Sequence, residues 1–319
     1  MRPPGLLDRR LLFVTGKGGV GKTSVAAALA ALAAAQGRRT LLCEIDAKGD
    51  LAEVLEVEPL RYAPREVLPQ LFAMAMSTEE SLKEYLRLQL RVPLLAKIGP
   101  LARTFDFVAS AAPGVKEILT IGKLAFEVRE NHYDLVVVDS SATGHVVGQL
   151  AAPGAIREVV RAGAVRGQVD WILDILQDPA QTGAVIVATA EEMPIAETIE
   201  LAASLGSKTY VDLAAVIVNQ VLPELFGVRE EELFSSLRTV ASRRKLVAEL
   251  GEGVNGVLDA AALAVARRRA RAVHLEALYD ALGPSVPMLY LPFLFARRHG
   301  VRTTRRLSAA LAAELGVDA

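Results

Sequence analysis

The chain has 319 residues, of which 52% are hydrophobic, and its 36 basic and 37 acidic residues give a formal net charge of −1 at pH 7. A chain of this length can bury a large core, which suits one large α/β domain with or without an inserted subdomain. The balanced charge argues against a nucleic-acid partner, because nucleic-acid-binding surfaces are usually basic.

The chain also lacks the segments that mark membrane or secreted proteins. No run of about 20 apolar residues is present, so we predict no transmembrane segment. The first residues lack the apolar region of a signal peptide. Cys43 is the single cysteine, which excludes an intramolecular disulfide. We therefore expect a cytoplasmic protein.

Short apolar runs recur along the chain. Residues 11–15 form one that ends in glycines, which is typical of a strand buried on both faces of a parallel sheet. An alanine-rich segment over residues 22–36 predicts the next helix, which Gly37 would end. Six similar runs follow, at residues 40–45, 71–76, 135–139, 184–188, 214–218 and 288–291. Helical patterns separate most of them, so the sequence predicts an α/β fold with a mostly parallel sheet and helices on both faces.

Two stretches interrupt this alternation. Residues 78–130, and less clearly residues 150–180, have helical patterns with no strand between them. We interpret them as a helical subdomain that serves as a lid or binds a partner, within a single domain over residues 1–319. Trp171 lies in the second stretch, where it either packs between helices or lines a groove for an apolar client.

Residues 16–23 read GKGGVGKT, which fits the phosphate-loop pattern G-x-x-x-x-G-K-[ST] between a strand and a helix. Glycines let backbone N–H groups converge on phosphate oxygens, and the helix N-terminus adds positive potential. The pattern predicts a P-loop NTPase fold that binds ATP and Mg²⁺, with Lys22 on the β- and γ-phosphates and the Thr23 hydroxyl on the metal. The expected nucleotide-binding residues of the loop are Gly16, Gly18, Gly19, Val20, Gly21, Lys22, Thr23 and Ser24.

Lys17 directly follows the first glycine of the loop, where a lysine is not needed to hold phosphate within one chain. It resembles the signature lysine of the deviant P-loop class, whose members form nucleotide-sandwich dimers. In that class the lysine reaches the nucleotide of the other subunit, like an arginine finger. The partner would be an identical chain or a paralogous subunit.

Two acids end predicted strands near this loop, at the edge where ligands of α/β proteins bind. Asp46 ends the second strand, where a carboxylate can position the attacking water near the γ-phosphate. Asp139 ends the run Val-Val-Val-Asp, a Walker B pattern, and is expected to hold Mg²⁺ through water. Residues 140–145, which follow Asp139, read SSATGH.

These blocks and several others resemble the ArsA-type ATPases, which include the arsenical-pump ATPase and the ATPase that targets tail-anchored membrane proteins. The most family-specific block is D-[ST]-x-x-T-G-H at residues 139–145. Others are APGVKE at 112–117, EEMP at 191–194 with Glu197 and Thr198, VNQ at 218–220, and LPF at 291–293 followed by Gly300.

The resemblance implies roles for particular residues. Asp46 would be the hydrolytic aspartate, acting with Lys17 and Lys22, and Asp139 the Mg²⁺-linked acid. Asn219 would read adenine, although a strand-end asparagine can also bond to backbone. The resemblance also implies that Pro292 closes over the base. Thr143, Gly144 and His145 would form the second switch, with His145 either sensing the γ-phosphate or packing at a helix start.

The chain departs from the family in its first switch and in its thiols. The usual D-P-A-H-N is replaced by DAKGD at residues 46–50, which puts the turnover rate in question, and Ala142 stands where proline is usual. A metalloid site needs several thiolates, and Cys43 is alone in a predicted buried strand. We therefore expect neither an arsenite site nor the zinc clamp of the targeting ATPases.

The sequence thus predicts an ATPase (an ATP phosphohydrolase) whose switches drive a client or membrane partner. The alternative is a regulatory or scaffolding ATPase of the septum-positioning or partition type. The arginines at 267, 268, 269 and 271 are interpreted as a solvated helix face. A small amphipathic helix is expected near residues 305–311, and membrane contact by it stays open.

Overall fold

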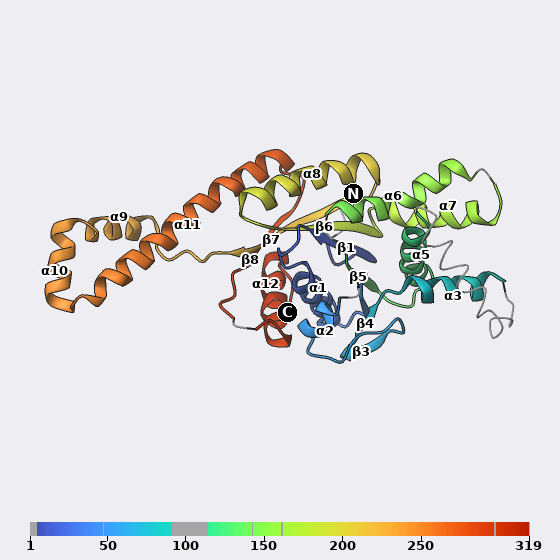
Figure 1. The fold of residues 1–319 in the computed structure, drawn as a ribbon, viewed down its shortest axis with the longest axis horizontal. Coiled ribbons are helices and arrows are strands. Elements are labelled where there is room, and N and C mark those ends of the chain that lie inside the picture. The colour runs from blue at the N-terminus through green and yellow to red at the C-terminus, as the bar shows by residue number, and fades with distance from the viewer. Residues whose placement is uncertain are drawn as a thin grey trace.

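The computed structural model describes residues 5–46, 48–90, 114–141, 143–160, 162–296 and 298–318. Within these ranges eight strands form one sheet in the order β3-β4-β2-β5-β1-β6-β7-β8 (Figure 1). Neighbouring strands are parallel except β3, which is antiparallel to β4. The strands are β1 (Leu11–Gly16), β2 (Thr40–Glu44), β3 (Arg65–Leu68), β4 (Leu71–Ala75), β5 (Leu135–Asp139), β6 (Thr182–Thr189), β7 (Leu213–Val221) and β8 (Met288–Pro292).

Helices cover both faces of this sheet (Figure 1). The helices of the described residues are α1 (Lys22–Ala35), α2 (Asp50–Val54), α3 (Thr78–Leu90), α5 (Val115–Arg129), α6 (Thr143–Val159), α7 (Ala164–Leu176), α8 (Glu192–Lys208), α9 (Val228–Leu237), α10 (Val240–Leu250), α11 (Gly253–Leu282) and α12 (Val301–Leu315).

Alternation along the buried strands divides the core into two layers. In β1, Leu12 and Val14 belong to the cluster formed with α1, α2 and α12. Leu11 and Phe13 belong to the cluster on the other face, with α5, α6, α7 and α8. Every residue of β1 is buried, because successive side chains point to opposite faces and both faces are covered. This arrangement confirms the predicted α/β fold of the P-loop type.

All seven predicted strands are present, but the sequence prediction missed β3. Its residues are mostly half-exposed, and it lies at the sheet edge beside β4. Arg65 and Glu66 interrupt any apolar run there, so the pattern of a buried strand is absent. A tight turn joins the two strands at Gln70, which has a φ of +62°.

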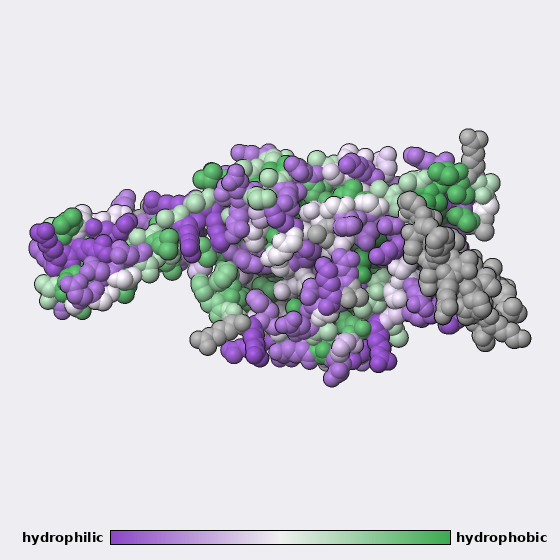
Figure 2. Space-filling model, viewed as in Figure 1, coloured by the Kyte–Doolittle hydropathy of each residue, from purple (hydrophilic) through white to green (hydrophobic). Residues whose placement is uncertain are grey.

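The predicted helical stretches at 78–130 and 150–180 contain α3, α5, α7 and part of α6. Residues 91–113 lie outside the described residues, as do Ala47 and Ala142 of the two switches. Helices α3, α5, α6 and α7 gather at one end of the molecule (Figure 1). Figure 2 shows a hydrophobic patch at this end. Val159 of α6 and Val165 of α7 are among the exposed hydrophobic residues of these helices.

A second group of helices extends from the opposite end. Helices α9, α10 and α11, which we call the arm, leave the body and fold back at α10 (Figure 1). The 30-residue α11 contains two buried residues, Leu258 and Leu278. The sequence indicated a long helix here but gave no sign that it projects.

Candidate functional site

The phosphate loop connects the end of β1 to the start of α1, as predicted. Gly16 has a φ of +144°, and a Cβ atom there would lie 2.1 Å from the Val187 carbonyl oxygen. Gly21 has a φ of +91°, and a Cβ atom would lie 2.5 Å from Asn219 Nδ2. Both positions therefore require glycine. Helix α1 has no side-chain cap at its start, and uncapped N–H groups at the start of a helix are suited to binding an anion.

Two residues of opposite charge, Lys22 and Asp139, influence each other beside this loop. Lys22 Nζ donates a hydrogen bond to the Lys17 carbonyl oxygen at 3.1 Å. Burial lowers the pKa of Lys22, and the negative charge of Asp139 opposes that shift. Burial raises the pKa of Asp139 to about 6, against the opposing effects of a hydrogen bond from Thr23 and the charge of Lys22. A buried carboxylate beside a hydroxyl suits a hard divalent cation.

Glu44 is a buried acid that the sequence analysis passed over. It is the register partner of Asp139 on the neighbouring strand, and the residue is 3% exposed. Its Oε1 atom lies 3.5 Å from the backbone nitrogen of Leu51 in α2. Burial raises the pKa of Glu44, while hydrogen bonds from the backbone at Leu51 and Gly49 lower it. Glu44 therefore anchors the segment that follows Asp46, and an acid inside an apolar run was the signal for it.

The structure brings the two predicted switches to one cleft of about 550 Å³. Asp46 is exposed on the loop after β2 and lines this cleft. Gly144 and His145 line it from the first turn of α6, which begins at Thr143. The start of α5 closes another side, through Gly114, Lys116 and Glu117.

Asn219 and Pro292 lie at the ends of the neighbouring strands β7 and β8. Asn219 is 5% exposed, and its side-chain amide donates to the Val20 carbonyl oxygen in the phosphate loop at 2.9 Å. Its Oδ1 atom accepts from the Gln220 N–H at 2.9 Å. The amide thus makes the backbone contacts that the sequence analysis kept as the alternative to adenine binding. Pro292 is exposed and pairs with Val221.

Lys17 is held by an acid of the same chain. Its Nζ atom lies 2.7 Å from Glu197 Oε1 on α8, and both side chains are partly exposed. Cys43 is fully buried in β2, and burial raises the pKa of its thiol. Among the residues that the structure describes, no group of three or more His, Cys, Asp and Glu side chains is placed to hold a metal ion, and no helix is long and apolar enough to span a membrane.

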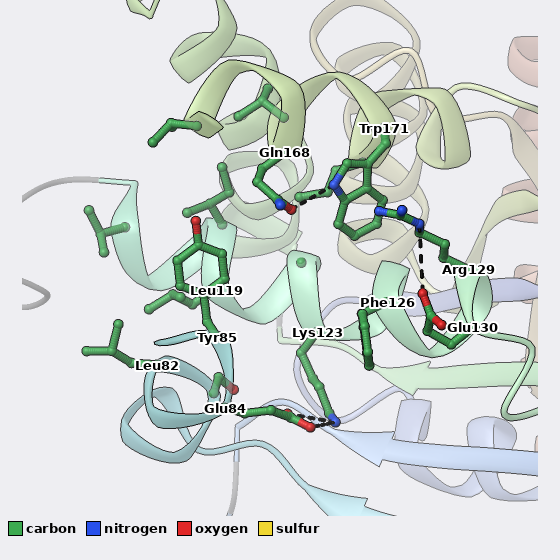
Figure 3. Close-up of a pocket in the computed structure, with 17 residues that line it drawn as sticks. Leu82, Glu84, Tyr85, Leu119, Lys123, Phe126, Arg129, Glu130, Gln168 and Trp171 are labelled. Carbon is green, nitrogen blue, oxygen red and sulfur yellow. Dashed lines mark hydrogen bonds and ion pairs between the residues drawn. The ribbon is translucent and has the colours of Figure 1, made fainter. Parts of the chain in front are cut away.

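A second cavity, of about 620 Å³, lies between α3, α5 and α7 (Figure 3). Its lining is mainly apolar and includes Leu82, Leu119, Phe126 and Trp171. The Trp171 indole donates to Gln168 Oε1 at 2.7 Å, and the Arg129 guanidinium lies over its ring at 4.9 Å. Trp171 thus both packs between helices and lines a cavity.

Comparisons with known proteins agree with the motifs. Residues 9–171 and 161–246 match the family model of the anion-transporting ATPases, ArsA_ATPase. ATPase BagA of Mycobacterium tuberculosis is 31% identical over 232 residues, which cover 69% of this chain and 68% of that protein. The arsenical pump-driving ATPase of Acidiphilium multivorum is 28% identical over 242 residues, covering 67% and 40%. ATPase GET3 of Podospora anserina is 25% identical over 256 residues, covering 68% and 75%. The match to the family model and the ordered motifs show that this chain belongs to the ArsA-type family of anion-transporting ATPases.

Proposed function

We propose that this protein hydrolyses Mg²⁺-bound ATP at the phosphate loop and uses the cycle to act on a protein client or membrane partner. One observation carries the proposal. Helix α5 lines the switch cleft at Lys116 and Glu117, and the same helix lines the apolar cavity at Leu119 and Phe126. A movement of the switches would therefore be transmitted to the cavity by one rigid element.

The proposed chemistry assigns each residue of the loop a task. Lys22 and the N–H groups at residues 16–24 would bind the phosphates. Thr23, and Asp139 through water, would hold Mg²⁺, which neutralises phosphate charge when bound. Asp46 would orient the attacking water. Asn219 would bind adenine with its second Nδ2 hydrogen and its second Oδ1 lone pair, because the two backbone hydrogen bonds use only one of each. Pro292 would cover the base.

The proposed active form is a dimer, either of two copies or with a paralogous subunit. Lys17 would exchange Glu197 for the nucleotide of the partner. The pair with Glu197 is partly exposed, and such pairs contribute about 1 kcal/mol or less, so nucleotide phosphates can displace it.

We further propose that α3, α5, α6 and α7 form the helical subdomain and that the cavity accepts an apolar segment of the client. The lining of aromatic and aliphatic side chains supports this, since an apolar segment that enters such a cavity removes apolar surface from water, which favours binding. Charged groups at its margin, Arg129 and Glu130, would contact the polar flanks of that segment (Figure 3).

The alternative of a membrane-positioned scaffold receives less support. A membrane-binding tail needs a free apolar face. Helix α12 instead buries Leu307 and Leu311 in the core cluster that contains α1, so its apolar face is occupied.

Nucleotide binding and turnover test the proposal. The wild-type protein should release phosphate from ATP with Mg²⁺ and not with excess EDTA, and Lys22→Ala should abolish both binding and release. Equal phosphate release by wild-type and Lys22→Ala proteins would refute the proposal.

A further inference from the structure

Arg271 joins the arm to the carboxyl edge of the sheet. It lies on α11, and its guanidinium contacts two separate segments of the body. One nitrogen donates to the Gln220 carbonyl oxygen at 3.3 Å. Another lies 3.0 Å from Glu191 Oε1. The side chain is 26% exposed, and it lines two small cavities formed by α11 with the segments that follow β6 and β7.

The first contact leads directly to the phosphate loop. The Gln220 carbonyl accepts from Arg271, the Gln220 N–H donates to Asn219 Oδ1, and Asn219 Nδ2 donates to the Val20 carbonyl. These are consecutive links from the arm to the loop. Gln220 has a φ of +58°. Residues other than glycine adopt this left-handed backbone conformation at a cost in free energy. Contacts at both its N–H and its carbonyl hold it there.

The second contact leads to the same loop by another route. Glu191 is the residue immediately before α8. Helix α8 carries Glu197, whose carboxylate binds Lys17 in the phosphate loop. Arg271 is thus linked to the loop through β7 and through α8.

The neighbouring arginines make different contacts. Arg268 pairs with Glu224 in the segment before α9, and Arg269 pairs with Glu231 on α9 itself. Their pairs lie at the arm and its root. The prediction that these arginines form a solvated helix face is therefore wrong for Arg271, whose side chain contacts the body. Arg269 is mostly exposed, as predicted.

We propose that Arg271 is a positioning residue for nucleotide binding: it fixes Gln220, and through it Asn219, against the phosphate loop, and so couples the arm to nucleotide affinity. The inference rests on the proposed function, because it assumes that ATP binds at this loop. Loss of the guanidinium lets Gln220 leave its left-handed conformation, and Asn219 then loses its fixed place beside Val20. The defect falls on nucleotide affinity and not on the turnover of bound ATP. By reciprocity, a partner that moves the arm changes nucleotide affinity.

Three variants test this. Arg271→Ala removes both contacts, and Arg271→Lys keeps charge for Glu191 but cannot bridge both partners with a planar fork. Arg269→Ala, the matched control, removes an adjacent arginine that pairs within the arm. Hydrogen–deuterium exchange of the nucleotide-free proteins should rise at residues 16–23 and 219–221 in Arg271→Ala and stay at the wild-type level in Arg269→Ala. This readout does not depend on ATP binding.

Affinity for a fluorescent ATP analogue gives the second readout. We expect a loss of about tenfold in Arg271→Ala, a similar or smaller loss in Arg271→Lys, and no loss in Arg269→Ala, with kcat changed less than twofold. Wild-type exchange and affinity in a folded Arg271→Ala protein would overturn the inference alone. A wild-type protein that binds no ATP analogue would overturn the proposed function. If Arg271→Ala unfolds, Arg271→Lys decides: wild-type affinity in that variant contradicts the bridging role.

Discussion

Glu44 and Asp139 are register partners at the ends of the adjacent strands β2 and β5, and both carboxyl groups are buried. The charge of Glu44 adds to the effect of burial on Asp139. Two buried acids so close together oppose ionisation, since each charge disfavours the other. A bound cation would relieve this cost.

The pKa of Asp139 predicts a pH dependence of stability in the nucleotide-free protein. Its value of about 6 lies above the ordinary 3.8, so its contribution to stability is present below about pH 4 and is lost as pH rises through about 6. Asp139→Asn should therefore raise the free energy of unfolding at pH 7.5, by at most roughly 3 kcal/mol, and by less at pH 5. Urea denaturation at both pH values measures this. An equal gain at both would contradict it.

Asp46→Asn should abolish turnover while nucleotide binding persists. Asp46 lies on an exposed loop at the switch cleft, so the substitution removes a charge without disturbing the core. Loss of a residue that orients the attacking water typically lowers the rate by about 100-fold or more. Phosphate release and analogue binding should be measured on the same protein.

Asp50→Asn is the matched control, because it removes the same charge from the segment that Glu44 anchors. It should retain most of the activity. Equal losses in Asp46→Asn and Asp50→Asn would mean that the loop acts through its summed charge, and the hydrolytic role of Asp46 would be wrong.

Antimonite and arsenite should leave the ATPase rate unchanged. Cys43 is fully buried, and burial raises the pKa of its thiol, so a thiolate for a soft metalloid is unavailable there. Assays with and without antimonite decide the point. Stimulation that survives Cys43→Ser would reveal a metalloid site built from other ligands.

The sequence predicted the parts of the fold that depend on local pattern. The strands at the centre of the sheet are apolar runs because helices cover both faces. Strand β3 was not predicted because it lies half-exposed at the sheet edge, where a continuous apolar run is not required. The helical pattern around Arg271 predicted a helix, but it does not show where that helix lies relative to the sheet. The arm and the contact of Arg271 with Gln220 were therefore not predicted. Glu44 was not predicted because the acids expected to bind the nucleotide end their strands, whereas Glu44 lies within an apolar run. A lone acid in such a run needs buried partners.

Filling the cavity between α3, α5 and α7 should block client binding. Gly122 lies on its wall, where an added Cβ atom would lie 3.6 Å from Ile172 Cδ1. Gly122→Leu therefore extends a side chain into the space that we assign to the client. Gly206→Leu, on the exposed surface of α8, adds the same side chain to a helix elsewhere.

Binding of a dye-labelled apolar helical peptide to the ATP-bound Asp46→Asn protein measures the effect. We expect Gly122→Leu to weaken binding by about tenfold, from loss of burial and overpacking, and Gly206→Leu to leave it unchanged. Equal binding by both variants would place the client site elsewhere.

The last prediction concerns Lys17, which we expect to act on the nucleotide held by the other subunit. Lys17→Ala and Asp46→Asn should each be inactive alone. In a mixed dimer the Lys17→Ala chain keeps its own Asp46 and receives the native Lys17 of its partner, so that site alone should turn over. Random mixing of equal amounts should then restore about a quarter of wild-type activity.

Light scattering in the presence of ATP must confirm that mixed dimers form. Dimers without recovered activity would place Lys17 in its own site, where its contact with Glu197 would be structural. If the chain remains monomeric with ATP, the homodimer is wrong and a paralogous subunit becomes the expected partner. Glu197→Gln separates these readings further, because it removes the acid that holds Lys17 within the chain and leaves the lysine itself intact. The substitution should increase dimer formation if Lys17 acts on the nucleotide of the other subunit. It should leave dimer formation unchanged if Lys17 acts within its own subunit.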